Sequence, residues 1–95
     1  MKLIMIYADA ARLDAVRANL KELNAPGYTV LAVEEGAGKT GVHTGDRVHP
    51  GSLALVMVIE EDGRAEALFD ELVRRRDAHD DHMSRLFMVP VLRQA

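Results

Sequence analysis

Two short runs of strand-forming residues, 3–7 and 53–59, carry apolar side chains on both of their faces. Successive side chains of a strand point to opposite faces, so Leu55 and Met57 point to one face and Val56 points to the other. A strand with one face in water alternates with polar residues instead. Both runs are therefore predicted to lie in the middle of a sheet whose two faces are covered.

Two other stretches have the spacing of amphipathic helices. The first follows Asp9, which can cap a helix, and ends where Asn-Ala-Pro-Gly stands at 24–27. The second follows Asp62, a second candidate cap, and ends near three arginines at 74–76; the polar residues 77–84 are expected to form a loop or a frayed helix end. The apolar positions are Leu13, Val16, Leu20 and Leu23 in the first stretch, and Ala65, Leu68, Phe69, Leu72 and Val73 in the second.

Strands over 28–33 and 86–92 complete the order strand, helix, strand, strand, helix, strand, the β-α-β-β-α-β pattern of ferredoxin-like α+β folds. We predict one domain over 1–95, with a four-stranded antiparallel sheet and two helices on one face. Pro90 favours an edge position for the last strand, because proline cannot donate a hydrogen bond to a sheet. A long loop over 35–52, which holds five of the seven glycines and for which extended strand ends at its base are an option, separates the second strand from the third.

The apolar second face of this sheet predicts an oligomer. Two helices cover only one face, and large apolar patches are uncommon on monomers. Another copy of the chain is the simplest cover for the other face. The alternative is a single domain that tolerates an apolar patch.

Composition narrows the classes of function. A formal net charge of -3 and the lack of a basic arm argue against nucleic-acid binding. No apolar stretch approaches the roughly 20 residues of a membrane span, so we expect no membrane insertion. The absence of cysteine excludes disulfides and thiolate metal sites, and it is compatible with the cytoplasm, where we place the protein.

The first 41 residues and the last strand carry a family likeness. They read Met1-Lys2-Leu3-Ile4, then Leu13-Asp14-Ala15-Val16-Arg17 with Leu20, then Gly27-Tyr28-Thr29-Val30 with Val33, then Gly36-Ala37-Gly38-Lys39-Thr40-Gly41, and finally Leu86-Phe87-Met88-Val89-Pro90-Val91. This pattern resembles the nitrogen regulatory PII proteins, and the glycine-rich run is similar to the entry into their long T-loop.

The resemblance implies a homotrimeric signalling protein that is not an enzyme. Its clefts between subunits would bind a small effector, an adenine nucleotide, and the T-loop over 35–52 would reach a regulated target protein. An effector that changes the order of such a loop is a known kind of switch. By position, the residues at the cleft would be Thr29, Glu35, Gly36, Ala37, Gly38 and Lys39, with Lys39 near the phosphates.

One segment departs from the PII pattern. The family has a second loop with glycine and lysine before its last strand, whereas residues 77–84 contain no glycine and three aspartates. Acidic side chains repel a triphosphate unless a cation lies between them.

Four histidines offer an alternative, a trimeric metal-binding protein like the copper-tolerance CutA proteins. Imidazole with carboxylate suits zinc, copper or nickel, so His43, His49, His79 and His82 are the candidate ligands of a divalent metal. A closed zinc site needs four ligands, which different subunits would have to supply. Solvated loop histidines are the plainer interpretation.

Enzymatic interpretations are weaker. A P-loop needs glycine five residues before its Gly-Lys pair, and Val33 stands there. His43, Thr44, Asp46 and His49 would share one loop, which is poor preorganisation for catalysis. A small enzyme or degradative dimer remains a third class, since ferredoxin-like domains have many functions.

Overall fold

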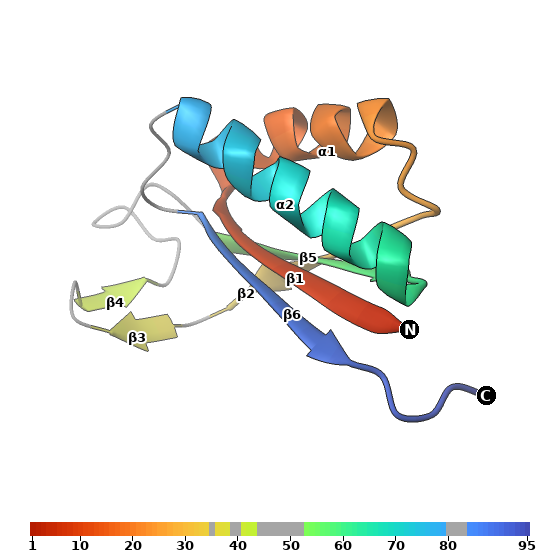
Figure 1. Ribbon diagram of the computed structural model, residues 1–95. Coiled ribbons are helices and arrows are strands. Elements are labelled where there is room, and N and C mark those ends of the chain that lie inside the picture. The colour runs from red at the N-terminus through yellow and green to blue at the C-terminus, as the bar shows by residue number, and fades with distance from the viewer. Residues whose placement is uncertain (35, 39–40, 44–52, 80–83) are drawn as a thin grey trace.

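The computed structural model describes residues 1–34, 36–38, 41–43, 53–79 and 84–95 (Figure 1). A four-stranded antiparallel sheet has the strand order β2-β5-β1-β6, and β3 pairs with β4 in a separate two-stranded sheet. The elements are β1 (Lys2–Asp9), the 3-10 turn η1 (Ala10–Arg12), α1 (Leu13–Glu22), β2 (Thr29–Val33), β3 (Gly36–Gly38), β4 (Gly41–His43), β5 (Leu53–Glu60), α2 (Asp62–Ala78) and β6 (Arg85–Pro90).

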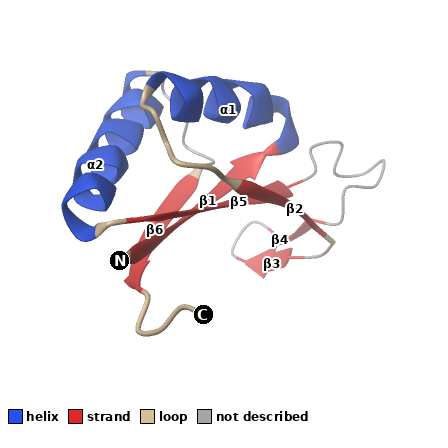
Figure 2. Cartoon of the chain, turned by 90° about the vertical axis from the view of Figure 1, so that its right-hand side faces the viewer, coloured by secondary structure: helices blue, strands red, loops and turns tan. Residues whose placement is uncertain are grey.

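This architecture confirms the predicted ferredoxin-like fold. β1 and β5 are the two central strands, and they pair along their whole lengths, from Lys2 opposite Glu60 to Asp9 opposite Leu53. Both helices lie on the same side of the sheet (Figure 2). Pro90 ends the edge strand β6, where a missing N–H group costs no sheet hydrogen bond.

The core lies between the helices and one face of the sheet. Alternate side chains of β1 and β5 point toward the helices, and the helices meet them with apolar stripes at the predicted positions. These residues, all buried, are Ile4, Ile6, Ala8, Ala54, Val56 and Val58 from the strands, with Val16 and Leu20 from α1 and Ala65, Leu68 and Leu72 from α2. The side chains that recur with the 3.6-residue period of the helices and the two-residue period of the strands are therefore buried together, between the helices and the sheet.

The opposite face of the sheet, which we call the open face, is also apolar. The cross-strand register puts Met57 of β5 beside Met5 of β1, and Met5 beside Phe87 of β6. Phe87 is 45% exposed, as are Leu31 and Ile59. Tyr7 packs edge-on against Phe87, with 6.1 Å between ring centres. Apolar surface of this extent predicts that another chain covers the open face.

α2 begins and ends differently from the sequence prediction. α2 reaches Ala78 and therefore includes the first two residues of the expected polar loop. Asp62 does not cap it; Glu61 is the N-cap, without a side-chain cap bond, and Asp62 lies in the first turn. There the amino group of Met1 donates a hydrogen bond to the Asp62 carboxylate and holds its pKa below the ordinary value.

α1 begins and ends by local backbone chemistry. Asp9 caps the η1 turn, as predicted, by accepting a hydrogen bond from the N–H of Ala11 at 3.0 Å. At the other end, Asn24 adopts a left-handed conformation with φ 57°. The N–H of Asn24 binds the carbonyl of Lys21, and the N–H of Ala25 binds that of Leu20. This is the Schellman arrangement, so Asn24 stops the helix before Pro26 and Gly27 are reached.

Within the segment 35–52, the described residues form a short two-stranded ribbon, which is more than the extended strand ends that a long loop allowed. β3 and β4 pair in antiparallel register, with Gly36 opposite His43 and Gly38 opposite Gly41. Such a ribbon is made by backbone hydrogen bonds, and it needs no alternating apolar pattern. The last strand is also shorter than predicted, because β6 ends at Pro90, after which the N–H of Val91 binds the carbonyl of Met1.

Truncating the core should unfold the domain more readily. Leu20 is 0% exposed, so Leu20→Ala is expected to lower the free energy of unfolding by about 2–5 kcal/mol, because it leaves a cavity. Lys21→Ala, at the exposed neighbouring position, should change it by no more than about 0.5 kcal/mol. Urea unfolding at one protein concentration measures both, and equal effects would contradict this placement of the core.

Candidate functional site

Thr29, the first predicted cleft residue, begins the edge strand β2. It is exposed and lies opposite Met57, so its side chain belongs to the open face. An open hollow surrounds it, lined by Leu3, Pro26, Gly27, Tyr28, Met57 and Ile59. In this hollow, a flat apolar ligand can contact the hydroxyl group of Thr29 and the exposed ring of Tyr28. The hollow lies at the margin of the open face, where a covering chain would complete it.

The glycine-rich residues lie beyond the other end of the same strand. Gly36, Ala37 and Gly38 form β3, while Glu35 and Lys39 lie outside the described residues. β2 runs from Thr29 to Val33, roughly 13 Å at the usual rise per residue. One chain therefore does not place Thr29 directly beside the glycines. A single ligand that touches both must extend along this edge of the sheet.

The predicted metal ligands do not form a site in the part of the chain that the structure describes. His79 is exposed directly after α2, and His43 ends β4, whereas His49 and His82 lie outside the described residues. Among the described residues, no three histidine, aspartate or glutamate side chains gather to hold a metal ion. Neither this arrangement nor the comparisons below support the CutA-like alternative.

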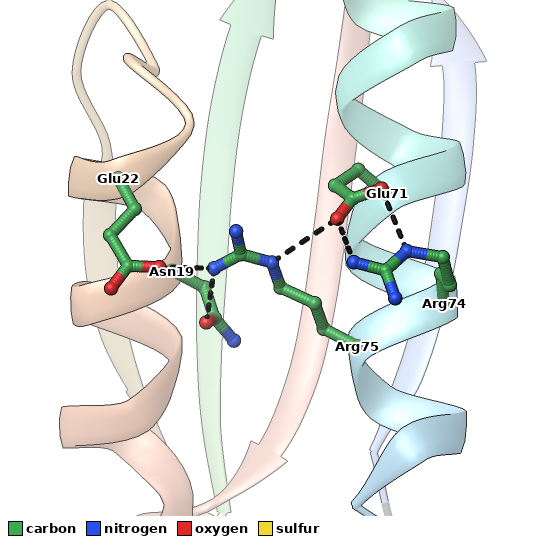
Figure 3. A network of polar contacts seen from close by, with 5 residues as sticks. All are labelled: Asn19, Glu22, Glu71, Arg74 and Arg75. Atoms are coloured by element: carbon green, nitrogen blue, oxygen red, sulfur yellow. Dashed lines mark hydrogen bonds and ion pairs between the residues drawn. The ribbon is translucent and has the colours of Figure 1, made fainter.

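A polar network joins the two helices (Figure 3). The Arg75 side chain crosses from α2 to α1, where its Nη1 donates to Asn19 Oδ1 at 2.9 Å and also to Glu22. Its Nε lies 3.4 Å from an oxygen of Glu71, and Arg74 donates two hydrogen bonds to the same carboxylate. Within the arginine run at the end of α2, Arg75 therefore joins the two helices directly.

Charge pairing shifts the pKa values in this network. Hydrogen bonds from Arg74, and then from Arg75, lower the pKa of Glu71 to about 2. The contact with Glu22 raises the pKa of Arg75, and the contact with Glu71 raises that of Arg74. Sequence spacing indicates the pairs within α2, three and four residues apart. The contact between Arg75 and α1 joins residues far apart in the sequence, so spacing gives no signal for it.

The comparisons with known proteins agree with this fold. The sequence matches the family described as "Nitrogen regulatory protein P-II" over residues 1–94. A comparison with curated protein sequences finds no match. Among the described residues, no helix is long and apolar enough to cross a membrane.

Solved structures share the architecture at low sequence identity. CPII, a nitrogen regulatory PII-like protein from Thiomonas intermedia K12, bound to ADP, AMP and bicarbonate, superposes with a TM-score of 0.72 at 18% identity, over 93% of this chain and 82% of that one. CPII bound to ADP and bicarbonate gives 0.71 at 17%, with the same coverage. A DUF3240 family protein from Shewanella baltica OS155 gives 0.72 at 15%, over 99% and 92%. At these identities the likeness is one of fold.

The ferredoxin-like sheet, with its glycine-rich insertion between β2 and β5, is the architecture that this chain shares with PII-like proteins. This chain belongs to the nitrogen regulatory protein P-II family.

Removing the Glu71 charge should weaken the helix pair in a pH-dependent way. The pKa of Glu71 is about 2 in the folded protein against an ordinary 4.5, so its stabilisation is complete above about pH 4.5 and is lost as the pH falls toward 2. Glu71→Gln is expected to lower Tm at pH 7, and the gap to the wild type should narrow from about pH 5 downward.

Calorimetry of both proteins across this pH range measures the gap. Glu66→Gln, at an exposed position of the same helix, is the matched control and should show a small gap at every pH. A gap for Glu71→Gln that stays constant down to pH 3 would contradict the pairing with Arg74 and Arg75.

Proposed function

We propose that this protein is a homotrimeric signal-transduction protein of the cytoplasm, not an enzyme, that binds an adenine nucleotide at clefts between its subunits. The binding controls the segment 35–52, through which the trimer acts on a target protein. The match to the P-II family over nearly the whole chain carries this proposal. The ligands of the CPII structures, ADP with AMP and bicarbonate, support a nucleotide as the effector.

The open face supports assembly from identical subunits. Most of its side chains are apolar, with contributions from all four strands. Burying such surface stabilises association by roughly 25 cal/mol per Å². A closed ring of three copies would bury one open face from each chain. The edge strand β2 would then lie at a junction between subunits, with Thr29 at one end and the 35–52 segment at the other.

The chemistry at the two ends of β2 suits the base and the phosphates of a nucleotide. The hollow around Thr29 and Tyr28 offers apolar walls, an aromatic ring and a hydroxyl for the base. Backbone N–H groups near Gly36 and Gly38, with Lys39, offer donors and charge for the phosphates. The acidic 77–84 segment favours a nucleotide with fewer phosphate charges, so we expect AMP or ADP to bind better than metal-free ATP.

A charge on the open face should abolish assembly. The wild type is expected to have about three times the 10.5 kDa mass of one chain, measured by light scattering after size exclusion. Phe87→Asp buries an unpaired carboxylate in any such interface and should give monomers. Ala67→Asp, on the exposed surface of α2, is the control and should keep the wild-type mass. A monomeric wild type would contradict trimer assembly.

Nucleotide binding should stabilise the protein, and Lys39 should be required for it. A ligand at 100 times its dissociation constant adds about 2.7 kcal/mol of stability, enough to raise Tm by several degrees. We expect this rise with ADP or AMP in a thermal-shift titration, its loss in Lys39→Ala and its retention in Lys21→Ala. Zinc, copper and nickel belong in the same titration. No rise with any adenine nucleotide would contradict the proposed effector, and a rise with metal alone would favour the histidine site.

A further inference from the structure

One apolar side chain is far more exposed than the others. Leu92 is 91% exposed, whereas no other large apolar side chain among the described residues exceeds 45%. It belongs to the segment 91–95, which follows β6 and whose first residue, Val91, donates its backbone N–H to the carbonyl of Met1. A single exposed leucine is common on protein surfaces, so its meaning depends on the surface that it can reach.

An apolar hollow of sufficient size lies at the same end of the sheet. It is the open hollow around Thr29, about 350 Å³ in volume, and its described lining residues are all uncharged. Val89, Leu3 and Ile59 share one cross-strand row of the sheet. Leu3 and Ile59 line the hollow, and Val91 follows Val89 by two residues. The segment 91–95 and the hollow are therefore level with each other along the strand direction.

Geometry favours a contact between two copies of the chain. Leu92 does not enter the hollow of its own chain, because it is almost fully exposed. β6 and β2 are opposite edges of the sheet, roughly 14 Å apart at the usual spacing of strands. A closed ring of identical chains repeats one contact between two different surface patches. The simplest ring of three sets the β6 edge of one copy against the β2 edge of the next. With the axis along the strands, the segment and the neighbouring hollow meet.

The charges beside the leucine and beside the hollow are complementary. Glu61 follows Ile59 by two residues in extended backbone, with φ -66° and ψ 151°, so alternation places both side chains on one side of the sheet. Arg93 follows Leu92, and both Arg93 and Glu61 are exposed. Among the described residues, neither of these two side chains has an ion-pair partner. Opposite charges of this kind set the orientation of a contact more than its strength.

We propose that the segment 91–95 of one copy docks on the next copy, with Leu92 in the hollow around Thr29 and Arg93 near Glu61. The inference rests on the proposed trimer and adds regulation to its candidate nucleotide site. The hollow is the proposed place of the base, so the segment and the nucleotide would compete for it. A site without nucleotide would be covered by the neighbouring leucine, and a nucleotide would have to displace it.

Spin labelling tests the contact between copies. The chain has no cysteine, so Gln94→Cys provides a single attachment point for a nitroxide. Spin-labelled chains of natural isotope content are refolded together with ¹⁵N-labelled wild-type chains, and each broadened amide signal then reports a contact between copies. We expect the strongest broadening at Tyr28, Thr29 and Ile59, and the weakest at Ala67 on the exposed surface of α2.

Two outcomes of this experiment are separable. A trimer by light scattering without broadening at Tyr28 and Thr29 would overturn the docking of the segment and leave the trimer intact. A monomeric wild type would overturn the trimer and the docking together. Adding Leu92→Asp to the spin-labelled chain should reduce the broadening, because a carboxylate does not enter an apolar hollow without a large desolvation cost.

Competition is tested by nucleotide affinity. Leu92→Asp is expected to bind ADP at least threefold more tightly than the wild type in isothermal titration calorimetry, because the competitor is removed. Gln94→Ser, an exposed change in the same segment, should leave the affinity unchanged. Leu92→Ser, which adds no charge, is the second variant should Leu92→Asp not assemble. Unchanged affinity in trimeric Leu92 variants would overturn the competition. No ADP binding in the wild type would contradict the proposed effector, and the broadening alone would then decide the contact.

Discussion

Strands β1 and β5 pair from Lys2 opposite Glu60 to Asp9 opposite Leu53, and both carry apolar side chains on either face. The side chains that face the helices build the core. Those that face the other way, such as Met5 and Met57, leave an apolar surface that two helices cannot reach. Burial of apolar surface is the main stabilising force in folding and in association. The two apolar faces of the β1–β5 pair therefore favour the helix layer on one side and a partner chain on the other.

The same pairing puts β2 at an edge, and the candidate nucleotide site depends on that position. An edge strand borders solvent on one side, so the residues at its two ends are open to another chain or a ligand. Thr29 stands at one end, beside Tyr28 and the hollow of the open face. At the other end, β2 leads into the segment 35–52. In the proposed trimer, a ligand along this edge would contact both the neighbouring subunit and the segment 35–52.

Charge is distributed differently on the helix side. Arg75 links α2 to Asn19 and Glu22 of α1, while Arg74 and Glu71 pair along α2. Partly exposed ion pairs contribute little individually, but a network with fixed geometry holds its members at defined positions. Three arginines, with Asn19, Ser84 and apolar residues, line a small, partly open space between the helices and the sheet.

The sequence by itself determined the order of the elements, the central place of β1 and β5, the edge position of β6 and the buried stripes of both helices. These features follow from local periodicity and from the chemistry of single residues such as Pro90. The resemblance of the first 41 residues also indicated the family. Thr29 and Gly36 to Gly38 were named as cleft residues from that resemblance, and their place at opposite ends of β2 required the fold.

The tertiary structure decided the features that join distant residues or rest on the backbone alone. Asn24, in a left-handed conformation, ends α1 before Pro26 is reached. The amino group of Met1 donates a hydrogen bond to Asp62, and β3 pairs with β4 although neither has an apolar pattern. Arg12 and Arg75 meet around one space only because α1 and α2 pack on the same face of the sheet. Periodicity reports which side of an element is buried. It does not report which residues of two elements meet, because that depends on how the elements pack in three dimensions.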